Sequence, residues 1–383
     1  MEVSALPRTL LTASAVEAFF LLVMLGYGPL YLHVAWHADD FVASLAAAGP
    51  SLATFFGSTF WGHRVRAGGV RRVASIGLLG YVALGLWVFF DPGAIFYIVG
   101  VTAATLVSSA LAPVTLTYLT HEGGDMGRRL AARMKWQSSG WMTGGLLGGW
   151  LVSVSHRAFP TMMLVLAAFM ATEAILAIKA APVALRFSSD QTGPIQRSHW
   201  MTVLLVVPFF LAYAGNEGFF INFSLYLHAV HVTPAWVGWS SSISTGLGWA
   251  LAGSIGRWTD RIGGKTLLLG VLVGYVVMYL TMSLASSQMV VIVAFSLPLY
   301  PFLNIGIQRA VAESLPGHEH GGAMGIINGA TGLATFGGGA LMGGVDSLFG
   351  SQFIPWTAVG LVTAGLLAAT GLYRRNPGPV AAD

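Results

Sequence analysis

The chain has 383 residues, of which 55% are hydrophobic and only 9% are charged. Soluble domains carry roughly 25% charged residues because their surfaces must stay hydrated, so this composition excludes a water-soluble fold and indicates a membrane protein. The sequence contains no cysteine, which excludes disulfides, thiolate metal sites and cysteine catalysis. The net charge of +4 could suggest nucleic acid, but the positions of the basic residues argue against it.

Twelve hydrophobic segments are long enough to cross a bilayer. Crossing ~30 Å of hydrocarbon takes ~20 apolar residues, and backbone groups in lipid must be paired within a helix. The segments are residues 10–34, 41–62, 73–90, 93–119, 137–155, 158–180, 200–228, 234–256, 266–285, 288–311, 322–345 and 353–373. We therefore predict an all-α integral membrane protein with twelve transmembrane helices.

The basic residues fall on one side of this predicted threading. Of the 19 Lys and Arg residues, all except Arg157 lie in loops or helix ends on the side that holds both termini. Cytoplasmic loops carry an excess of Lys and Arg. We therefore expect a multi-pass protein of the inner (plasma) membrane with both termini in the cytoplasm, a lipid bilayer as its surroundings, and no nucleic-acid partner.

The two halves of the chain repeat one another. Tyr31-Leu32-His33 recurs as Tyr226-Leu227-His228, an offset of 195 residues (226 − 31). Further pairs at similar offsets are Pro113 with Pro301, and Gly144, Gly148 and Gly149 with Gly339, Gly343 and Gly344. We predict two six-helix halves, residues 1–181 and 200–383, joined by a cytoplasmic linker at 182–199. This organisation resembles the major facilitator superfamily, in which the substrate is held near the midplane between the repeats.

The loop after the eighth segment resembles a loop motif of that superfamily. It reads Gly256-x-x-x-Asp260-Arg261-x-Gly263, where glycines permit a tight turn and the charged residues can hold one half against the other. The resemblance implies a conformational latch formed by these four residues. A simple basic turn on the cytoplasmic side would give the same pattern.

Two acids lie deep in predicted membrane helices. An ionised carboxylate in the bilayer costs ~3 kcal/mol, so such residues face a partner or a polar cavity, and a neutral, proton-carrying form becomes accessible. Glu17 and Glu217 are therefore candidates for proton coupling, although a structural bond between helices is the alternative. Glu173, near the end of the sixth segment, is expected to meet Lys179 or lipid headgroups.

Polar side chains accompany Glu217 on several predicted helices. At 3.6 residues per turn, Tyr213 and Glu217 share one face, with Asn216 beside it. Amide, hydroxyl and aromatic groups together suit a polyhydroxylated or amphipathic ligand, although a water path or bonds between helices would look alike. The predicted substrate-binding residues are Glu217, Asn216, Asn222, Tyr213, Gln137, Trp141, Asn304, Gln308, Asn328 and Trp249.

A narrower resemblance covers about a third of the chain. The stretch from Asn216 to Leu225, the Asp260 loop, and Lys135-Trp-Gln-Ser-Ser139 resemble bacterial sugar efflux transporters, whose two asparagines match Asn216 and Asn222. The resemblance implies export of sugars or of related solutes.

We expect a monomeric, proton-coupled secondary transporter that exports a sugar or another small polar or amphipathic solute, without cofactor or metal. A multidrug/proton antiporter is the alternative. A membrane-embedded enzyme or sensor on a carrier scaffold is disfavoured, because the sequence has no His-Glu-x-x-His pattern and no cysteine. His228 and His231, near the predicted outer surface, are of a type that titrates near neutral pH.

Overall fold

The computed structural model describes residues 5–90, 93–115, 126–155, 157–179, 199–314 and 320–375. Within these ranges all regular structure is helical. The first group of helices is α1 (Ala5–Trp36), α2 (Asp40–Gly68), α3 (Val70–Phe90), α4 (Ala94–Ser108), α6 (Met126–Val154) and α7 (Ala158–Lys179). The second is α8 (His199–Ala229), α9 (Pro234–Ile262), α10 (Gly264–Leu284), α11 (Gln288–Phe295), α12 (Leu299–Ser314), α13 (His320–Phe349), the 3₁₀ turn η3 (Ser351–Phe353) and α14 (Ile354–Arg375).

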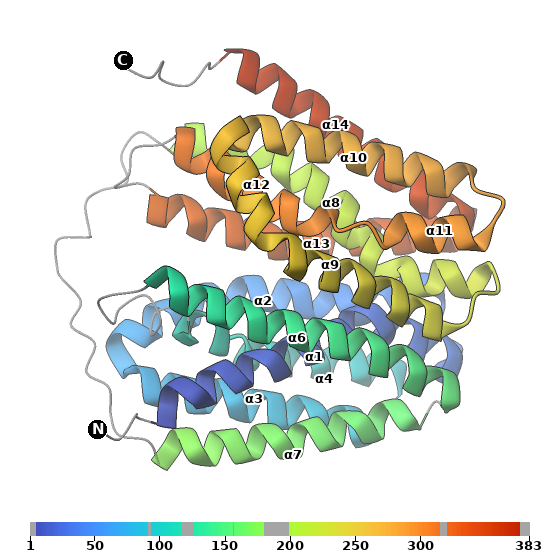
Figure 1. The fold of residues 1–383 in the computed structure, drawn as a ribbon. Coiled ribbons are helices and arrows are strands. Elements are labelled where there is room, and N and C mark those ends of the chain that lie inside the picture. Colours follow the sequence, from blue (N-terminus) through green and yellow to red (C-terminus); the bar gives the residue numbers. More distant parts are fainter. Residues whose placement is uncertain are drawn as a thin grey trace.

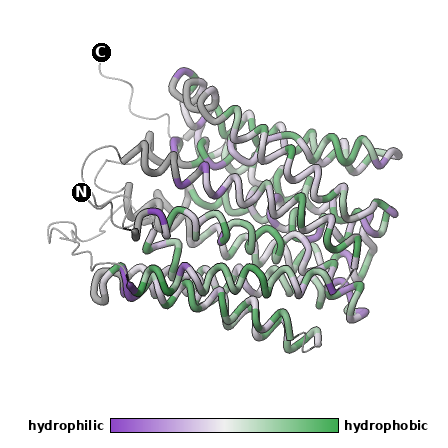
Figure 2. The backbone as a smooth tube through the Cα atoms, turned by 60° about the horizontal axis from the view of Figure 1, so that its bottom comes forward, coloured by the Kyte–Doolittle hydropathy of each residue, from purple (hydrophilic) through white to green (hydrophobic). Residues whose placement is uncertain are grey.

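The helices are arranged as two bundles, α1–α7 and α8–α14 (Figure 1). The start of α1 and the end of α14 lie at the same end of the molecule, which we call the termini end; the opposite end is the far end. Hydrophilic residues gather near the helix ends and hydrophobic residues along the helices (Figure 2). The predicted linker, apart from residue 199, lies outside the described residues, so the division into domains stays a prediction.

Eight stretches of the described helices are long and apolar enough to cross a membrane. They are Arg8–Trp36, Asp40–Gly62, Val70–Phe90, Ala94–Thr115, Ala158–Lys179, Gly264–Leu284, Gln288–Ile307 and Ser351–Tyr373. The remaining long helices, α6, α8, α9 and α13, each contact the opposite bundle.

Two of the predicted spans contain a short break in the helix, which hydrophobicity alone did not predict. In span 93–119, α4 ends at Ser108 and a turn at 109–110 precedes a helical segment at 111–115; in span 288–311, α11 ends at Phe295 and α12 begins at Leu299. Proline removes a backbone donor and clashes with the carbonyl four residues earlier. Pro113 and Pro301 act in this way on Ser109 and Leu297, which lie at the two breaks.

Each break is capped by a side chain from a neighbouring helix. The Trp61 Nε1–H on α2 donates to the Leu106 carbonyl at 2.8 Å, and the Ser244 hydroxyl on α9 donates to the Leu297 carbonyl at 3.1 Å. Carbonyl groups freed in lipid must find such donors. In both halves a donor from a neighbouring helix thus satisfies a carbonyl at the break: the Leu297 carbonyl is the one that Pro301 frees, and the Leu106 carbonyl lies three residues before Ser109.

The bundles meet most closely at the far end, along α6–α9 and α2–α13. The Ser242 hydroxyl on α9 donates to the Met142 carbonyl on α6 at 2.8 Å, and a Cβ on Gly238 would collide with the Gly145 carbonyl. On the other side, a Cβ on Gly343 would collide with the Ser44 side chain. Small residues let helix backbones approach in lipid, so these glycines make the far-end contact possible.

Candidate functional site

The central polar cluster of the second bundle is built around Glu217 on α8. Glu217 is 8% exposed, and its Oε1 accepts a hydrogen bond from Asn216 Nδ2 at 3.2 Å. Asn216 Oδ1 in turn accepts from the Tyr279 hydroxyl on α10 at 3.1 Å. Within the described residues, no cationic side chain acts on Glu217. The acid therefore has only neutral polar partners, an amide and phenols.

Four tyrosines surround this acid and interact with it electrostatically: Tyr213, Tyr275, Tyr279 and Tyr300. The Tyr213 and Tyr300 hydroxyls are 2.6 Å apart, and Asn304 bonds to Tyr300. Tyr300 stands on the first turn of α12, directly after the break in the span. The break thus positions a phenol beside Glu217 that a continuous helix would place elsewhere.

An aromatic group lies one turn from Glu217 toward the far end. The ring centroid of Phe220 on α8 is 6.4 Å from that of Trp141 on α6 and 6.4 Å from that of Phe295 on α11. A Cβ on Gly26 of α1 would contact the Phe220 ring as well, at 3.7 Å. Phe220 therefore bridges the two bundles, and Glu217 lies next to the surface where they meet.

Glu17, on α1 of the first bundle, has different neighbours. It is 4% exposed, with the Tyr81 hydroxyl and the Arg133 guanidinium as its polar neighbours, and Tyr81 in turn lies beside Ser108. Its Oε2 is enclosed without a hydrogen-bond partner. Glu17 thus faces a cation inside its own bundle.

The other predicted binding residues are scattered. Gln137 is half-buried on α6, one turn before Trp141, and Trp249 on α9 is 54% exposed. Asn222 is completely buried and donates to the carbonyls of Gly218 and, on α13, of Gly339 at 3.2 Å, which is a bond between helices. The side chains of Gln308 and Asn328 lie outside the described residues.

Only part of the predicted latch can be placed. The side-chain surroundings of Gly256 and Asp260 lie outside the described residues, while Arg261 is exposed. Gly263 has φ +79, a conformation that favours glycine, and Gly69 in the equivalent turn of the first bundle also has φ +79. The turn is thus shared by both halves.

Glu173 does not meet Lys179, contrary to the expectation from their spacing. Its Oε1 accepts a hydrogen bond from the Thr12 hydroxyl on α1 at 2.9 Å, and it is 7% exposed. This bond ties α7 to α1 within the first bundle. The misassignment arose because sequence spacing reports neighbours on one helix and not those on another.

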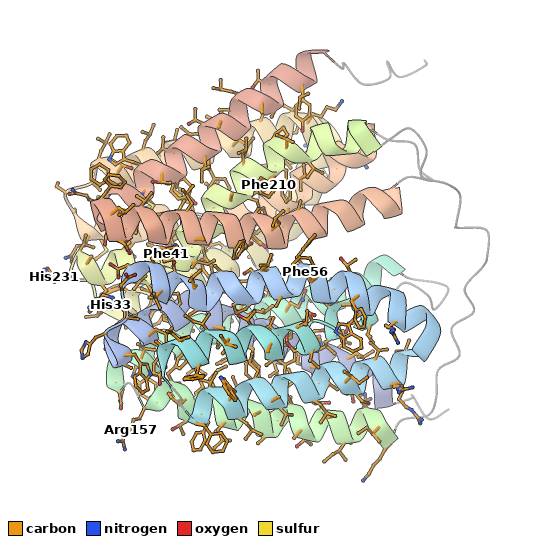
Figure 3. All side chains as sticks on the ribbon, turned by 180° about the vertical axis from the view of Figure 1, so that it is seen from behind. His33, Phe41, Phe56, Arg157, Phe210 and His231 are labelled. Atoms are coloured by element: carbon orange, nitrogen blue, oxygen red, sulfur yellow. The ribbon has the colours of Figure 1, made fainter. Side chains whose placement is uncertain are left out.

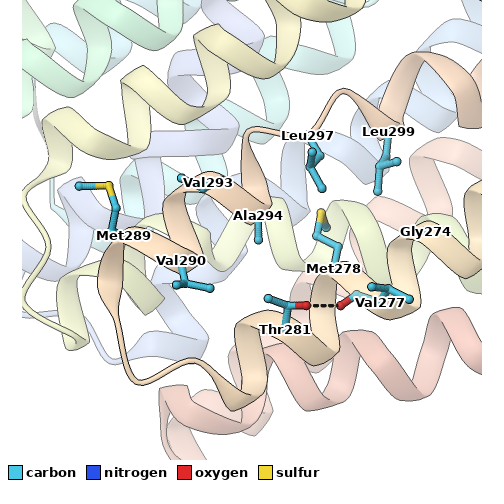
Figure 4. A pocket seen from close by; sticks show the side chains of 10 residues that line it. All are labelled: Gly274, Val277, Met278, Thr281, Met289, Val290, Val293, Ala294, Leu297 and Leu299. Atoms are coloured by element: carbon cyan, nitrogen blue, oxygen red, sulfur yellow. Dashed lines mark hydrogen bonds between the residues drawn. The ribbon is translucent and has the colours of Figure 1, made fainter.

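A groove of about 530 Å³ lies on the outer side of the second bundle, between α10 and the α11–α12 break (Figure 4). Its lining is apolar except for Thr281, whose hydroxyl is bonded to the Val277 carbonyl at 2.8 Å. Val277 and Val293 are more than half exposed. The groove faces the membrane side of the bundle and offers nothing to orient a polar solute.

Sequence reasoning missed the tyrosines of α10 and α12 and the role of Arg133, which was assigned only to a helix edge. One signal was present: Tyr81 and Tyr275 are 194 residues apart (275 − 81), close to the repeat offset. Among the described residues, no group of His, Asp or Glu could hold a metal ion.

Comparisons with known proteins bear on the whole chain. A family model described as Major Facilitator Superfamily matches residues 10–297 and again residues 205–382. No curated protein matches the sequence.

Similar solved structures span the chain almost completely. The nucleoside transporter NupG has 15% identity and a TM-score of 0.75, covering 98% of this chain and 100% of that one. The peptide transporter POT in complex with sulfate has 14% identity and a TM-score of 0.76, with coverages of 98% and 94%. A D-xylose-proton symporter has 11% identity and a TM-score of 0.75, with coverages of 97% and 97%. At these identities the likeness concerns the fold alone.

Proposed function

The chain belongs to the major facilitator superfamily of membrane transporters, and from this premise we propose that it is a proton-coupled secondary transporter in which Glu217 carries the proton. The observation that carries the proposal is the surroundings of Glu217. It is a buried acid with only neutral polar partners among the described residues, and it lies beside the surface where the bundles meet.

The chemistry follows from the cost of a charge away from water. A buried carboxylate without a cation is expensive in its ionised form and much less so as a neutral acid. Glu217 therefore keeps its proton while it is enclosed and releases it when water reaches it. When Glu217 is exposed to one side of the membrane and then to the other, this binding and release of a proton becomes directed proton transfer.

The far-end contacts correspond to one state of that cycle. The bundles are joined there by the glycines of α6, α9 and α13, and their helices diverge toward the termini end (Figure 1). The basic residues of the termini end favour the cytoplasm for that side. We therefore assign this structure to an inward-facing state of a monomeric inner-membrane protein.

The cargo we propose is a sugar or a related small polar or amphipathic solute, moved outward. Phenols, amides and an indole near Glu217 offer hydrogen bonds and flat aromatic surfaces, which suit a hydroxylated ring. The alternative is a multidrug/proton antiporter, since a carboxylate with Trp141 and Phe220 also suits a cationic amphiphile. Competition between labelled sugars and hydrophobic cations in transport assays separates the two.

The decisive test is Glu217→Gln in proteoliposomes. Glutamine keeps the shape and the hydrogen bond to Asn216 but cannot release a proton, so proton-gradient-driven transport should fall to the level of protein-free liposomes. Exchange of labelled for unlabelled solute without a gradient should persist. Glu173→Gln is the matched control, because it is a buried acid bonded within one bundle, and it should transport normally. Full gradient-driven transport by Glu217→Gln would remove Glu217 from the coupling scheme.

The sidedness has its own test. The native chain has no cysteine, so Arg157→Cys and Ile262→Cys can each be labelled with an impermeant maleimide in intact cells without background. Arg157→Cys should react from outside and Ile262→Cys only after the cells are opened. Labelling of both from the same side would contradict the proposed threading.

A further inference from the structure

Two histidines from equivalent positions of the internal repeat meet at the far end. His33 ends the Tyr-Leu-His stretch of α1 and His228 ends that of α8. Their ring centroids are 5.8 Å apart with an interplanar angle of 71°. The pair lies across the contact between the bundles. His33 is 36% exposed at its side chain and His228 is exposed, so protons from the solution at this end can reach both rings. Figure 3 shows His33 and His231 at this end, with Arg157.

The charged groups around the pair come from both bundles. From α2, Asp40 Oδ1 lies 2.9 Å from His33 Nδ1. From α13, Asp346 also acts on His33, and His231, just after α8, acts on His228.

The acids near the pair are themselves held in place. Asp346 is 3% exposed; its Oδ1 accepts a hydrogen bond from the Ser351 hydroxyl at 2.6 Å, while its Oδ2 is enclosed without a partner. Asp39 caps α2 and accepts from Ser347 on α13.

The first and the second proton have opposite effects on the contact. One proton on His33 is stabilised by Asp40 in its own bundle and by Asp346 across the interface, so it favours the closed far end. A second proton, on His228, places two like charges about 6 Å apart on opposite bundles, and like charges repel in water as well as in protein. The doubly protonated pair therefore favours separation of the bundles.

The histidine pair lies beside the contacts that hold the two bundles together at the far end. Beside it, the Phe41 backbone N–H donates to the Ser347 hydroxyl on α13 at 2.8 Å, and Ser44 is completely buried against Gly343. These contacts exist only while the bundles touch at the far end. A small separation there breaks them together.

We propose that His33 and His228 form a second proton-binding site, distinct from Glu217, whose double protonation opens the far end. The inference rests on the proposed alternating movement of the bundles. At this added site, acid in the solution at the far end favours the conformation in which Glu217 is open to that same solution.

The test uses Ser44→Cys as a reporter in the otherwise cysteine-free chain. Its side chain is enclosed when the far end is closed and becomes accessible when the bundles separate. In purified protein, maleimide labelling, corrected for thiolate fraction with a free cysteine peptide, should speed up about three- to tenfold between pH 8 and pH 5.5, the range in which histidine titrates. His33→Asn and His228→Asn should each abolish this dependence.

Two controls keep the outcomes distinct. His37→Asn removes an exposed histidine of the same end and should leave the pH dependence intact; His37 has φ +50, which asparagine tolerates. In Gly238→Val the added side chain collides with the Gly145 carbonyl and pushes α9 away from α6. The Ser44→Cys reporter should then react at every pH.

The results then separate this inference from the transport proposal. Suppose that Gly238→Val exposes the Ser44→Cys reporter, which shows that the bundles can separate. If labelling without the histidine changes is then independent of pH, or if both histidine variants keep the pH dependence, the histidine site is refuted while alternating movement stands. If Ser44→Cys stays unreactive even with Gly238→Val, the bundles do not separate at the far end and both proposals fail.

Discussion

Each half of this transporter places one buried acid on its first helix, and the two acids differ in a single kind of neighbour. Glu17 on α1 lies beside Tyr81 of α3 and the guanidinium of Arg133. Glu217 on α8 reaches Tyr279 of α10 through Asn216, and no cation acts on it among the described residues. The tyrosines come from the equivalent third helix of each half.

The comparison shows how one repeated scaffold supports two electrostatic roles. The Arg133 guanidinium on α6 acts electrostatically on Glu17, although Glu17 Oε2 has no hydrogen-bond partner, so a charge on this acid is offset by a cation of its own bundle. A carboxyl group beside an amide and phenols has no such reason to stay ionised. The acid without a cation is thus the one suited to exchange its proton, and repetition of the fold does not imply repetition of the chemistry.

The largest effect is expected from removing the acid that faces Arg133 in the first half. Glu17→Gln leaves the partly buried Arg133 guanidinium without the acid that offsets its charge, and an uncompensated charge away from water is destabilising. The thermal unfolding temperature in detergent should fall strongly, together with the yield of folded protein. Glu217→Gln leaves no cation without a partner among the described residues, so the unfolding temperature should change little.

The double variant Glu17→Gln with Arg133→Gln sharpens the same comparison. Removing both charges should restore most of the lost stability and leave proton-coupled transport in place. A double variant no more stable than Glu17→Gln alone would show that the two charges are not coupled. Restored stability without coupling would instead make Glu17 the proton carrier.

An intermediate effect is expected from the tyrosines. Tyr279→Phe leaves Asn216 Oδ1 without its donor, at a cost of about 1–3 kcal/mol for an unsatisfied buried group, and frees the amide that orients Glu217. The rate of gradient-driven transport should drop several-fold more than that of exchange. Tyr81→Phe, the matched change in the first half, should lower stability but slow both rates equally. Equal slowing by both variants would contradict the different roles of the two acids.

The smallest effect is expected at the helix breaks, where the halves are alike. Trp61→Phe and Ser244→Ala each remove one donor from a freed carbonyl. Hydrogen bonds between membrane helices are worth about 0.6 kcal/mol on average, and each carbonyl keeps a second donor, Ser109 Oγ at 2.9 Å and Leu299 N at 2.9 Å. Both variants should therefore lower the unfolding temperature slightly and by similar amounts. A large drop in only one would show that the breaks are not equivalent.

The sequence by itself determined the all-helical membrane fold, the approximate spans and the gathering of basic residues at one end. These follow from the solvent: lipid requires long apolar helices, and apolarity and charge can be read along a chain. It also indicated the repeat, and Glu217 with Tyr213 and Asn216 as neighbours, because 3.6 residues per turn relates positions on one helix.

Only the tertiary structure decided which groups from different helices meet. It placed Glu17 near Arg133, brought Tyr279 and Tyr300 to Glu217, bonded Glu173 to Thr12 and Asn222 to the Gly339 carbonyl, and set His33 against His228. The breaks at Ser109 and Leu297 also depended on it, because a proline kink is kept only where neighbouring helices satisfy the freed carbonyls. Helix periodicity relates residues along one axis, whereas charge pairing and backbone rescue depend on how separate helices pack.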